Sequence, residues 1–158
     1  MESFEFHLAE LNRRLENMVG VARIAAVDHG SARLRLDING RLSGWLPWPA
    51  EIGKDYRMWR PLREGTQVAF QAPGGDPANA VITKILYSDD RPAPETDPDS
   101  TLVQFDDGTF VRYDAGSKTL TAYSDGDLTV ECLGVLRLRS SSEIKLDAPV
   151  IQAFTEDA

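Results

Sequence analysis

The sequence predicts a mainly β protein: a short N-terminal helix, an OB-like barrel, and then a C-terminal trimeric intertwined β-helix, or β-prism. Three observations carry this prediction. Apolar residues recur at heptad spacing first, then alternate with polar residues, and finally recur every eight residues. An acidic, proline-rich stretch separates the last two patterns. The predicted segments are the helix 1–19, the barrel domain 20–87, the linker 88–101 and the β-helical domain 102–158.

The composition disfavours several functional classes. The chain has 158 residues, with 25 acidic residues against 17 Lys and Arg, for a formal net charge of -8. Because such a charge repels phosphate backbones, we expect no nucleic-acid partner. No run approaches the roughly 20 apolar residues of a membrane span. The N-terminus, with Glu2 and Glu5, does not resemble a signal peptide, so we expect synthesis as a soluble protein in the cytoplasm.

The first segment has the seam of a heptad repeat along one side of a helix. Two heptads are too short to hold a coiled coil together alone. Two interpretations therefore stay open: an amphipathic helix packed on its own domain, or a seam used inside an oligomer that other contacts hold. The seam residues are Phe4, Leu8, Leu11, Leu15 and Met18.

The segment 20–87 has short alternating stretches separated by turn signals. Asp28-His29-Gly30 and Asn39-Gly40 are typical of tight hairpin turns. The polar, irregular stretch 50–65 is expected to be a long loop. Five or so short strands with one helix predict a small closed barrel, for which an OB-like fold is the leading candidate.

Three tryptophans, Trp45, Trp48 and Trp59, lie in or beside proline-containing stretches of this domain. Exposed aromatic rings on an OB-like barrel can stack on single-stranded bases. The acidic charge and the interrupting prolines favour another role. We expect these rings to pack against the helix, a neighbouring subunit or a protein partner.

The C-terminal part is built on a period of eight residues. Inward apolar positions recur in two columns, and the alternate positions are mostly polar. Each unit offers one short strand and a small polar turn, as in β-solenoids and fibrous β-folds. The repeat fades at Gln152, where a tip or its docking surface is expected. The predicted core residues are Leu120, Leu128, Val130, Leu136, Leu138, Ile144, Leu146 and Phe154.

Energetics favour several chains over one for this repeat. Burying each inward side chain contributes about 1.5–3 kcal/mol, while ordering some eight residues costs about 1–2 kcal/mol apiece. A lone chain therefore gains close to nothing, and a three-sided prism is the simplest closed arrangement with a shared interior. An ordinary β-meander also explains the alternation, but it leaves one face of the sheet uncovered and its edges open.

Catalytic chemistry has no candidate constellation in the sequence. His29 lies in a turn, His7 lies beside the helix seam, and neither has a nucleophile signature nearby. The single cysteine, Cys132, occupies an inward position, where a buried apolar role is expected. We therefore predict no enzyme activity, no cofactor and no metal site.

Several motifs in a fixed order carry a resemblance to a known family. They are Trp45-Leu46-Pro47-Trp48, Trp59-Arg60-Pro61 running into Glu64-Gly65-Thr66-Gln67-Val68, Pro73-Gly74-Gly75-Asp76, Leu86-Tyr87-Ser88 with Arg91-Pro92-Ala93-Pro94, and Phe105-Asp106-Asp107-Gly108 with Tyr113-Asp114. Over nearly the whole chain the sequence resembles baseplate assembly protein V, the central spike of contractile phage tails and related R-type pyocins.

The resemblance implies a homotrimer in the virion tail baseplate. It implies that the barrel joins the hub and tail tube proteins, and that the β-helix pierces the host outer membrane when the sheath contracts. Many members end in a His-x-His pair that holds iron, but no histidine follows His29 here. Either a separate tip protein binds the C-terminus, or the tip is apolar or hydrated, or this chain is a shortened version.

Two other functions remain open on the sequence. The OB-like barrel is compatible with a module that binds single-stranded nucleic acid. A tail-associated protein that binds carbohydrate or degrades cell wall is the other alternative, although no acid/base pair supports it.

Overall fold

The computed structural model describes residues 2–153, with the side chains of residues 2 and 3 left out of the description. It is mainly β, with one α-helix and three sheets among these residues. The chain divides into two compact units, Met1–Thr96 and Asp97–Ala158, which we describe separately. The boundary between them lies within the segment 88–101, which the sequence predicts to be a linker.

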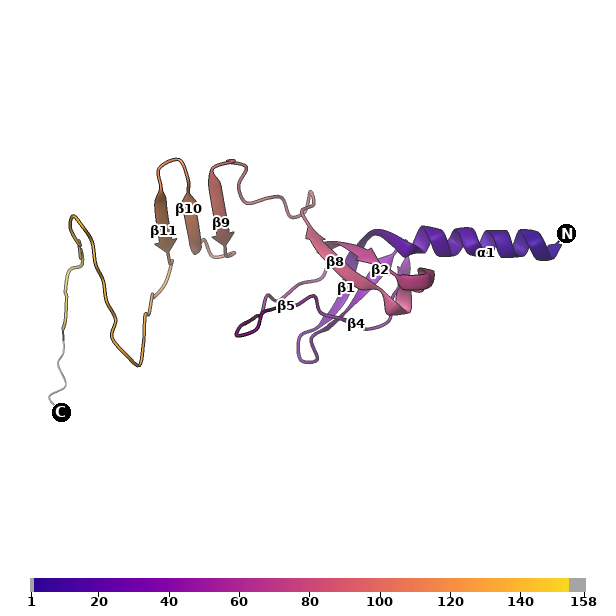
Figure 1. Ribbon diagram of the computed structural model, residues 1–158, viewed down its shortest axis with the longest axis horizontal. Helices are drawn as coiled ribbons and strands as arrows, with labels where there is room; N and C mark the ends of the chain where they lie inside the picture. The colour runs from indigo at the N-terminus through magenta and orange to yellow at the C-terminus, as the bar shows by residue number, and fades with distance from the viewer. Residues whose placement is uncertain (1, 154–158) are drawn as a thin grey trace. The chain divides into compact units, whose positions relative to one another are not determined.

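The first unit begins with helix α1 (Glu2–Met18), which runs directly into strand β1 (Val19–Asp28), as Figure 1 shows. The end of the helix is tied to the short 3-10 helix η1 (Pro73–Gly75). The backbone N–H of Ala72 donates to the carbonyl of Met18 at 2.8 Å. At Gly75, with φ +71, an added Cβ would lie 2.3 Å from the carbonyl oxygen of Arg14. A side chain is therefore excluded where η1 meets the helix backbone.

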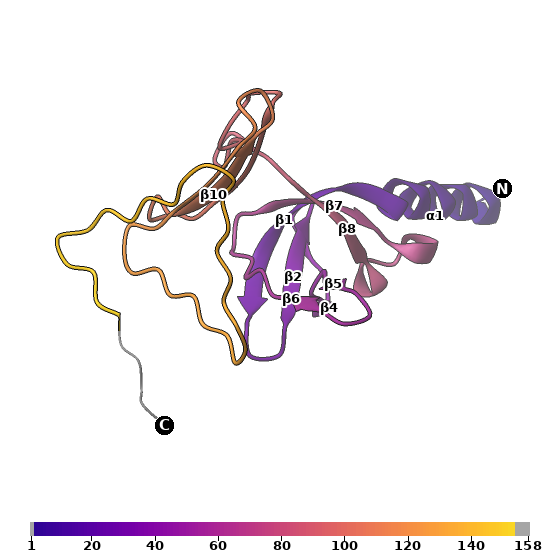
Figure 2. The same cartoon turned by 60° about the vertical axis from the view of Figure 1, so that its left-hand side comes forward.

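A six-stranded antiparallel sheet forms the body of this unit. Its strand order is β3-β2-β1-β7-β8, and β4 also pairs with β2 (Figure 2). A register shift in β1 lies between Ile24 and Ala26, and one in β7 lies between Ala69 and Phe70. Such bulges increase local twist and help a sheet to curve. The further strands are β2 (Arg33–Ile38), β3 (Arg41–Leu42), β4 (Leu46–Pro47), β7 (Gln67–Gln71) and β8 (Val81–Leu86).

The two predicted turns are confirmed. The Asp28 carboxylate accepts hydrogen bonds from the backbone N–H groups of Gly30 and Ser31 and from the Ser31 hydroxyl, which closes the turn before β2. Asn39 and Gly40 have φ values of 53 and 81 between β2 and β3. Positive φ at both central residues is the geometry of a type I′ hairpin turn, which asparagine and glycine tolerate best.

The expectation of a loop over 50–65 is partly wrong, because this stretch contains a small hairpin. Strands β5 (Glu51–Ile52) and β6 (Arg57–Met58) pair in antiparallel register. The N–H of Gly53 donates to the carbonyl of Tyr56 at 3.0 Å and closes the connection. Two-residue strands are too short to show an alternating pattern, so the sequence has no signal for them.

Among residues 2–153, all the buried apolar side chains belong to the first unit. Its apolar side chains alternate along the strands and meet in one cluster, which the short 3-10 helices η1 and η2 (Pro77–Asn79) flank. Buried polar groups are paired there: the Ser43 hydroxyl accepts from the N–H of Leu36 at 2.8 Å. The buried apolar residues are Ala22, Ile24, Leu34, Leu36, Ile38, Leu46, Val68, Phe70, Ala72, Ala80 and Ile82.

The second unit has a three-stranded antiparallel sheet in the order β11-β10-β9. Its strands are β9 (Ser100–Gln104), β10 (Phe110–Asp114) and β11 (Thr119–Tyr123). From 124 to 153 the chain has no assigned helix or strand. None of the helices in the described part of the chain is long and apolar enough to cross a membrane.

Candidate functional site

Between Asp97 and residue 153, the second unit has no interior of its own, because none of these residues is buried. Strand β11 is exposed along its whole length, and the side chain of Leu120 is 71% exposed. Even in the paired sheet, Val103 and Val111 on β9 and β10 are exposed. Apolar side chains left in water contribute nothing to folding, so this unit lacks the burial that normally stabilises a domain.

The eight-residue period of the sequence reappears as a period of bends. The backbone bends at Asp125–Gly126, at Leu133–Gly134, at Ser141–Ser142 and at Pro149, and it is extended between them. Figures 1 and 2 show this part of the chain as extended stretches joined by sharp corners. Each unit is therefore one extended segment and one corner.

The predicted core residues that the structure describes are all exposed to solvent in one chain. Seven of them are described, and each is between 54% and 71% exposed. The eighth, Phe154, lies outside the described residues. The seven are Leu120, Leu128, Val130, Leu136, Leu138, Ile144 and Leu146.

Within the described part of the chain, the backbone of the segment 124–153 pairs with no other stretch of backbone. The hydrogen bonds that it does form involve side chains, as from the N–H of Asp125 to the Thr109 hydroxyl at 3.3 Å. Buried peptide groups need hydrogen-bond partners, and extended segments usually find them on a neighbouring strand. A single chain supplies no such strand here. Along this segment, the extended backbone and the apolar side chains are thus both without a covering layer from the described part of the chain.

The helix seam is exposed as well. Phe4 is 73% exposed and Met18 is 40% exposed, with the other three seam residues between these values. Helix α1 makes its main contacts with η1 and β1 near its C-terminal end. Residues of the first unit therefore do not cover the seam, which leaves it available to a neighbouring chain.

Charges stabilise the helix away from the seam. Both Arg13 and Arg14 donate to the Glu10 carboxylate at 2.8 Å. These hydrogen bonds lower the pKa of Glu10 from 4.5 to about 2. Because the three side chains are solvent-exposed, their contribution to stability is small and sensitive to salt.

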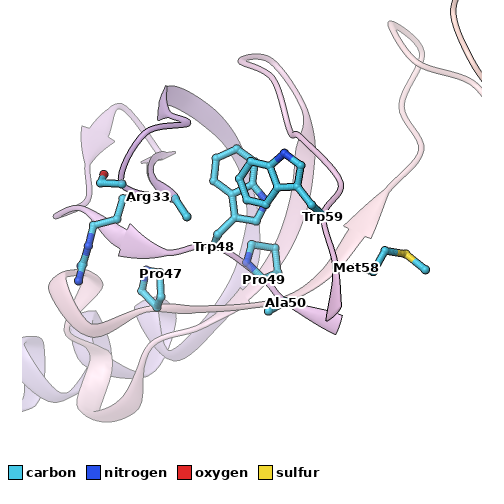
Figure 3. Close-up of a pocket in the computed structure, with 9 residues that line it drawn as sticks. Arg33, Pro47, Trp48, Pro49, Ala50, Met58 and Trp59 are labelled. Carbon is cyan, nitrogen blue, oxygen red and sulfur yellow. The ribbon is translucent and has the colours of Figure 1, made fainter. Parts of the chain in front are cut away.

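Two tryptophans form an aromatic cluster on the first unit. The rings of Trp48 and Trp59 stack with centroids 5.0 Å apart, and His29 lies 5.4 Å from Trp48. The indole N–H of Trp48 donates to the carbonyl of Arg60 at 3.2 Å. Figure 3 shows the two indole rings side by side near Pro49.

A pocket of about 310 Å³ opens beside the stacked rings. Its walls include Pro47, Pro49 and Met58, with Arg33 at the edge (Figure 3). Trp59 remains 54% exposed. A rigid, half-exposed aromatic surface of this kind is typical of contacts between proteins. The structure does not place the helix against these rings, so the packing on the helix that the sequence allowed is not observed.

Some exposed residues were not predicted as part of any site. Leu133 and Val135 flank Gly134 and are 111% and 86% exposed, respectively. The sequence marks them only as apolar exceptions on the polar face. Cys132, predicted at an inward position, is exposed in the single chain. The sequence singles out the tryptophans but contains no signal for the stacking of Trp48 on Trp59. Their contact depends on how the folded chain places β4 and β6.

Comparison with known proteins gives one informative relative. No family model matches the chain. The chain is 28% identical over 153 residues to the protein named Spike protein of Escherichia phage P2, and the match covers 92% of this chain and 72% of the relative. This similarity confirms the predicted resemblance to the baseplate spike family and supports the predicted location in the virion tail baseplate.

Proposed function

We propose that this chain, similar over most of its length to a phage spike protein, is the central spike of a contractile tail baseplate. Three copies form the spike, and it joins the tail hub through its N-terminal part. On sheath contraction it punctures the host outer membrane. The role is mechanical and not enzymatic: contraction supplies the work, and the spike supplies stiffness.

The observation that carries the proposal is the repeat without an interior. The units between 124 and 153 present apolar side chains to solvent and pair with no neighbouring strand, and corners follow at intervals of about eight residues. Three such chains wound together give each strand a partner and give each apolar side chain a shared core. A closed three-sided prism also removes the open sheet edges that one chain leaves.

The first unit supports a separate role as the attachment domain. Its six-stranded antiparallel sheet around a single core is compatible with the proposed OB-like barrel. The exposed helix seam and the Trp48–Trp59 surface are available for contacts with the hub, the tail tube or a neighbouring subunit. A separate tip protein at the C-terminus completes the proposed set of partners.

A pair of variants tests the shared interior. Leu138→Asp should block trimer assembly, because it would place three carboxylates in one apolar interior. Thr129→Asp is the matched control, since Thr129 lies on the alternate, outward side of the same strand pattern. Light scattering after size exclusion should show trimers for the control only. Normal assembly of Leu138→Asp would refute the assignment of the inward face.

A further inference from the structure

This inference rests on the proposed trimer. In such a trimer, the regular bends determine which residues of neighbouring chains lie side by side. One eight-residue unit runs between successive corners, so each unit covers one face of a three-sided prism. Threefold symmetry then places each unit of one chain beside the following unit of the next chain on the same face. A residue of one chain therefore lies beside the residue eight positions later in its neighbour, at the strand spacing of about 4.8 Å.

One outward column alternates in charge at this spacing. Glu131, Arg139 and Asp147 are separated by eight residues each. All three are exposed, and none forms an ion pair with another described residue. We propose that these residues form an ion-pair ladder between chains, Glu131 to Arg139 and Arg139 to Asp147, and that the ladder stabilises the offset of eight residues between neighbouring chains of the trimer.

The charge order favours this offset over pairing in which the chains are out of register. With no offset between neighbouring chains, each of these three residues would lie beside the same residue of the next chain, so that like charges would meet. With an offset of sixteen, Glu131 would lie beside Asp147, and like charges would meet again. Only an offset of eight places opposite charges side by side. Cross-strand pairs of opposite charge stabilise a sheet and like pairs destabilise it, so the column discriminates among registers that the apolar interior alone tolerates.

The neighbouring outward column offers a matched contrast. It contains Thr129, Arg137 and Lys145, also eight apart, so Arg137 would lie beside Lys145 of the next chain. Within its own chain Lys145 pairs with Glu143 at 2.9 Å. The charges of this column therefore do not favour the offset of eight. Replacing Arg137 with an acidic residue would remove its repulsion from Lys145 of the next chain. Replacing Arg139 with an acidic residue would create two repulsions, one with Glu131 and one with Asp147 of neighbouring chains.

The experiment compares Arg139→Glu with Arg137→Glu in the full-length chain. Light scattering first establishes the mass of each assembly. Thermal unfolding in urea at low salt should then show a melting temperature about 5 °C or more lower for Arg139→Glu and unchanged or raised for Arg137→Glu. The difference should shrink in 1 M salt because screening shortens the range of charge interactions to about 3 Å.

A charge-reversed triple variant provides the rescue. Combining Glu131→Arg, Arg139→Glu and Asp147→Arg restores opposite neighbours and should recover stability. Failure of Arg139→Glu to assemble, with normal assembly of Arg137→Glu, also supports the ladder. Equal effects of the two single variants, or no effect of either, would overturn it. A wild-type monomer would instead overturn the proposed function, so the two failures are distinguishable.

Discussion

Asp114 controls the turn between β10 and β11. Its carboxylate accepts a hydrogen bond from the N–H of Ser117 at 2.8 Å. Hydrogen bonds from the backbone and side chain of Ser117 lower the pKa of Asp114, and Arg112 adds a smaller attraction. Lys118, in the same turn, has a positive φ of 57. The turn thus combines an ionised carboxylate with a backbone conformation that few side chains favour.

This turn predicts a pH dependence. A carboxyl group with a lowered pKa stabilises the fold above its unfolded pKa, about 3.9, and loses that contribution as the pH falls through its lower folded value. The wild-type melting temperature should therefore fall more between pH 5 and pH 2.5 than that of Asp114→Asn. Asparagine keeps the acceptor oxygen and removes the titration. Parallel pH profiles for both proteins would contradict this role of Asp114.

At the scale of elements, the junction of α1 with the sheet depends on one glycine. Gly75 and Gly74 both have positive φ, 71 and 67. An added Cβ would collide with the backbone of Arg14 at Gly75, whereas at Gly74 no atom lies within 4 Å. An alanine at Gly74 would therefore strain only the backbone, whereas an alanine at Gly75 would strain the backbone and also clash with α1.

Alanine at these two positions gives a matched prediction. Gly74→Ala should lower the free energy of unfolding by about 1 kcal/mol, the usual cost of a left-handed conformation. Gly75→Ala should cost at least ~2 kcal/mol more, because η1 must move away from α1. Urea unfolding followed by circular dichroism measures both. Equal losses would show that the contact between η1 and α1 does not hold the helix.

The elements that could be predicted from the sequence are those that depend on residues close together in the chain. The turn at Asn39-Gly40 depends only on residues that tolerate positive φ, and the helix depends only on its own apolar spacing. The β5–β6 hairpin and the stacking of Trp48 on Trp59 depend on contacts made after folding. The period of eight predicted one small turn in each unit, and the backbone bends at 125–126, 133–134, 141–142 and 149. The trimer core stays a prediction, because its partners are on other chains.

At the scale of the whole molecule, the two units differ in how they reach stability. The first buries a continuous cluster of apolar residues from Ala22 to Ile82. The second buries none of its described residues, although it contains long apolar side chains at regular intervals. The first unit thus has a core within one chain, whereas the repeat would gain a core only in the proposed trimer. Dissociation and unfolding of the repeat should then be one concerted process.

The mass of the native assembly tests the central claim most directly. Light scattering or native mass spectrometry of the purified full chain at micromolar concentration should give three times the chain mass of 17.5 kDa. The trimer should also resist heating in detergent, since its repeat cannot unfold one chain at a time. A stable species with the mass of one chain would contradict the account, because the exposed repeat would then have no partner to cover it.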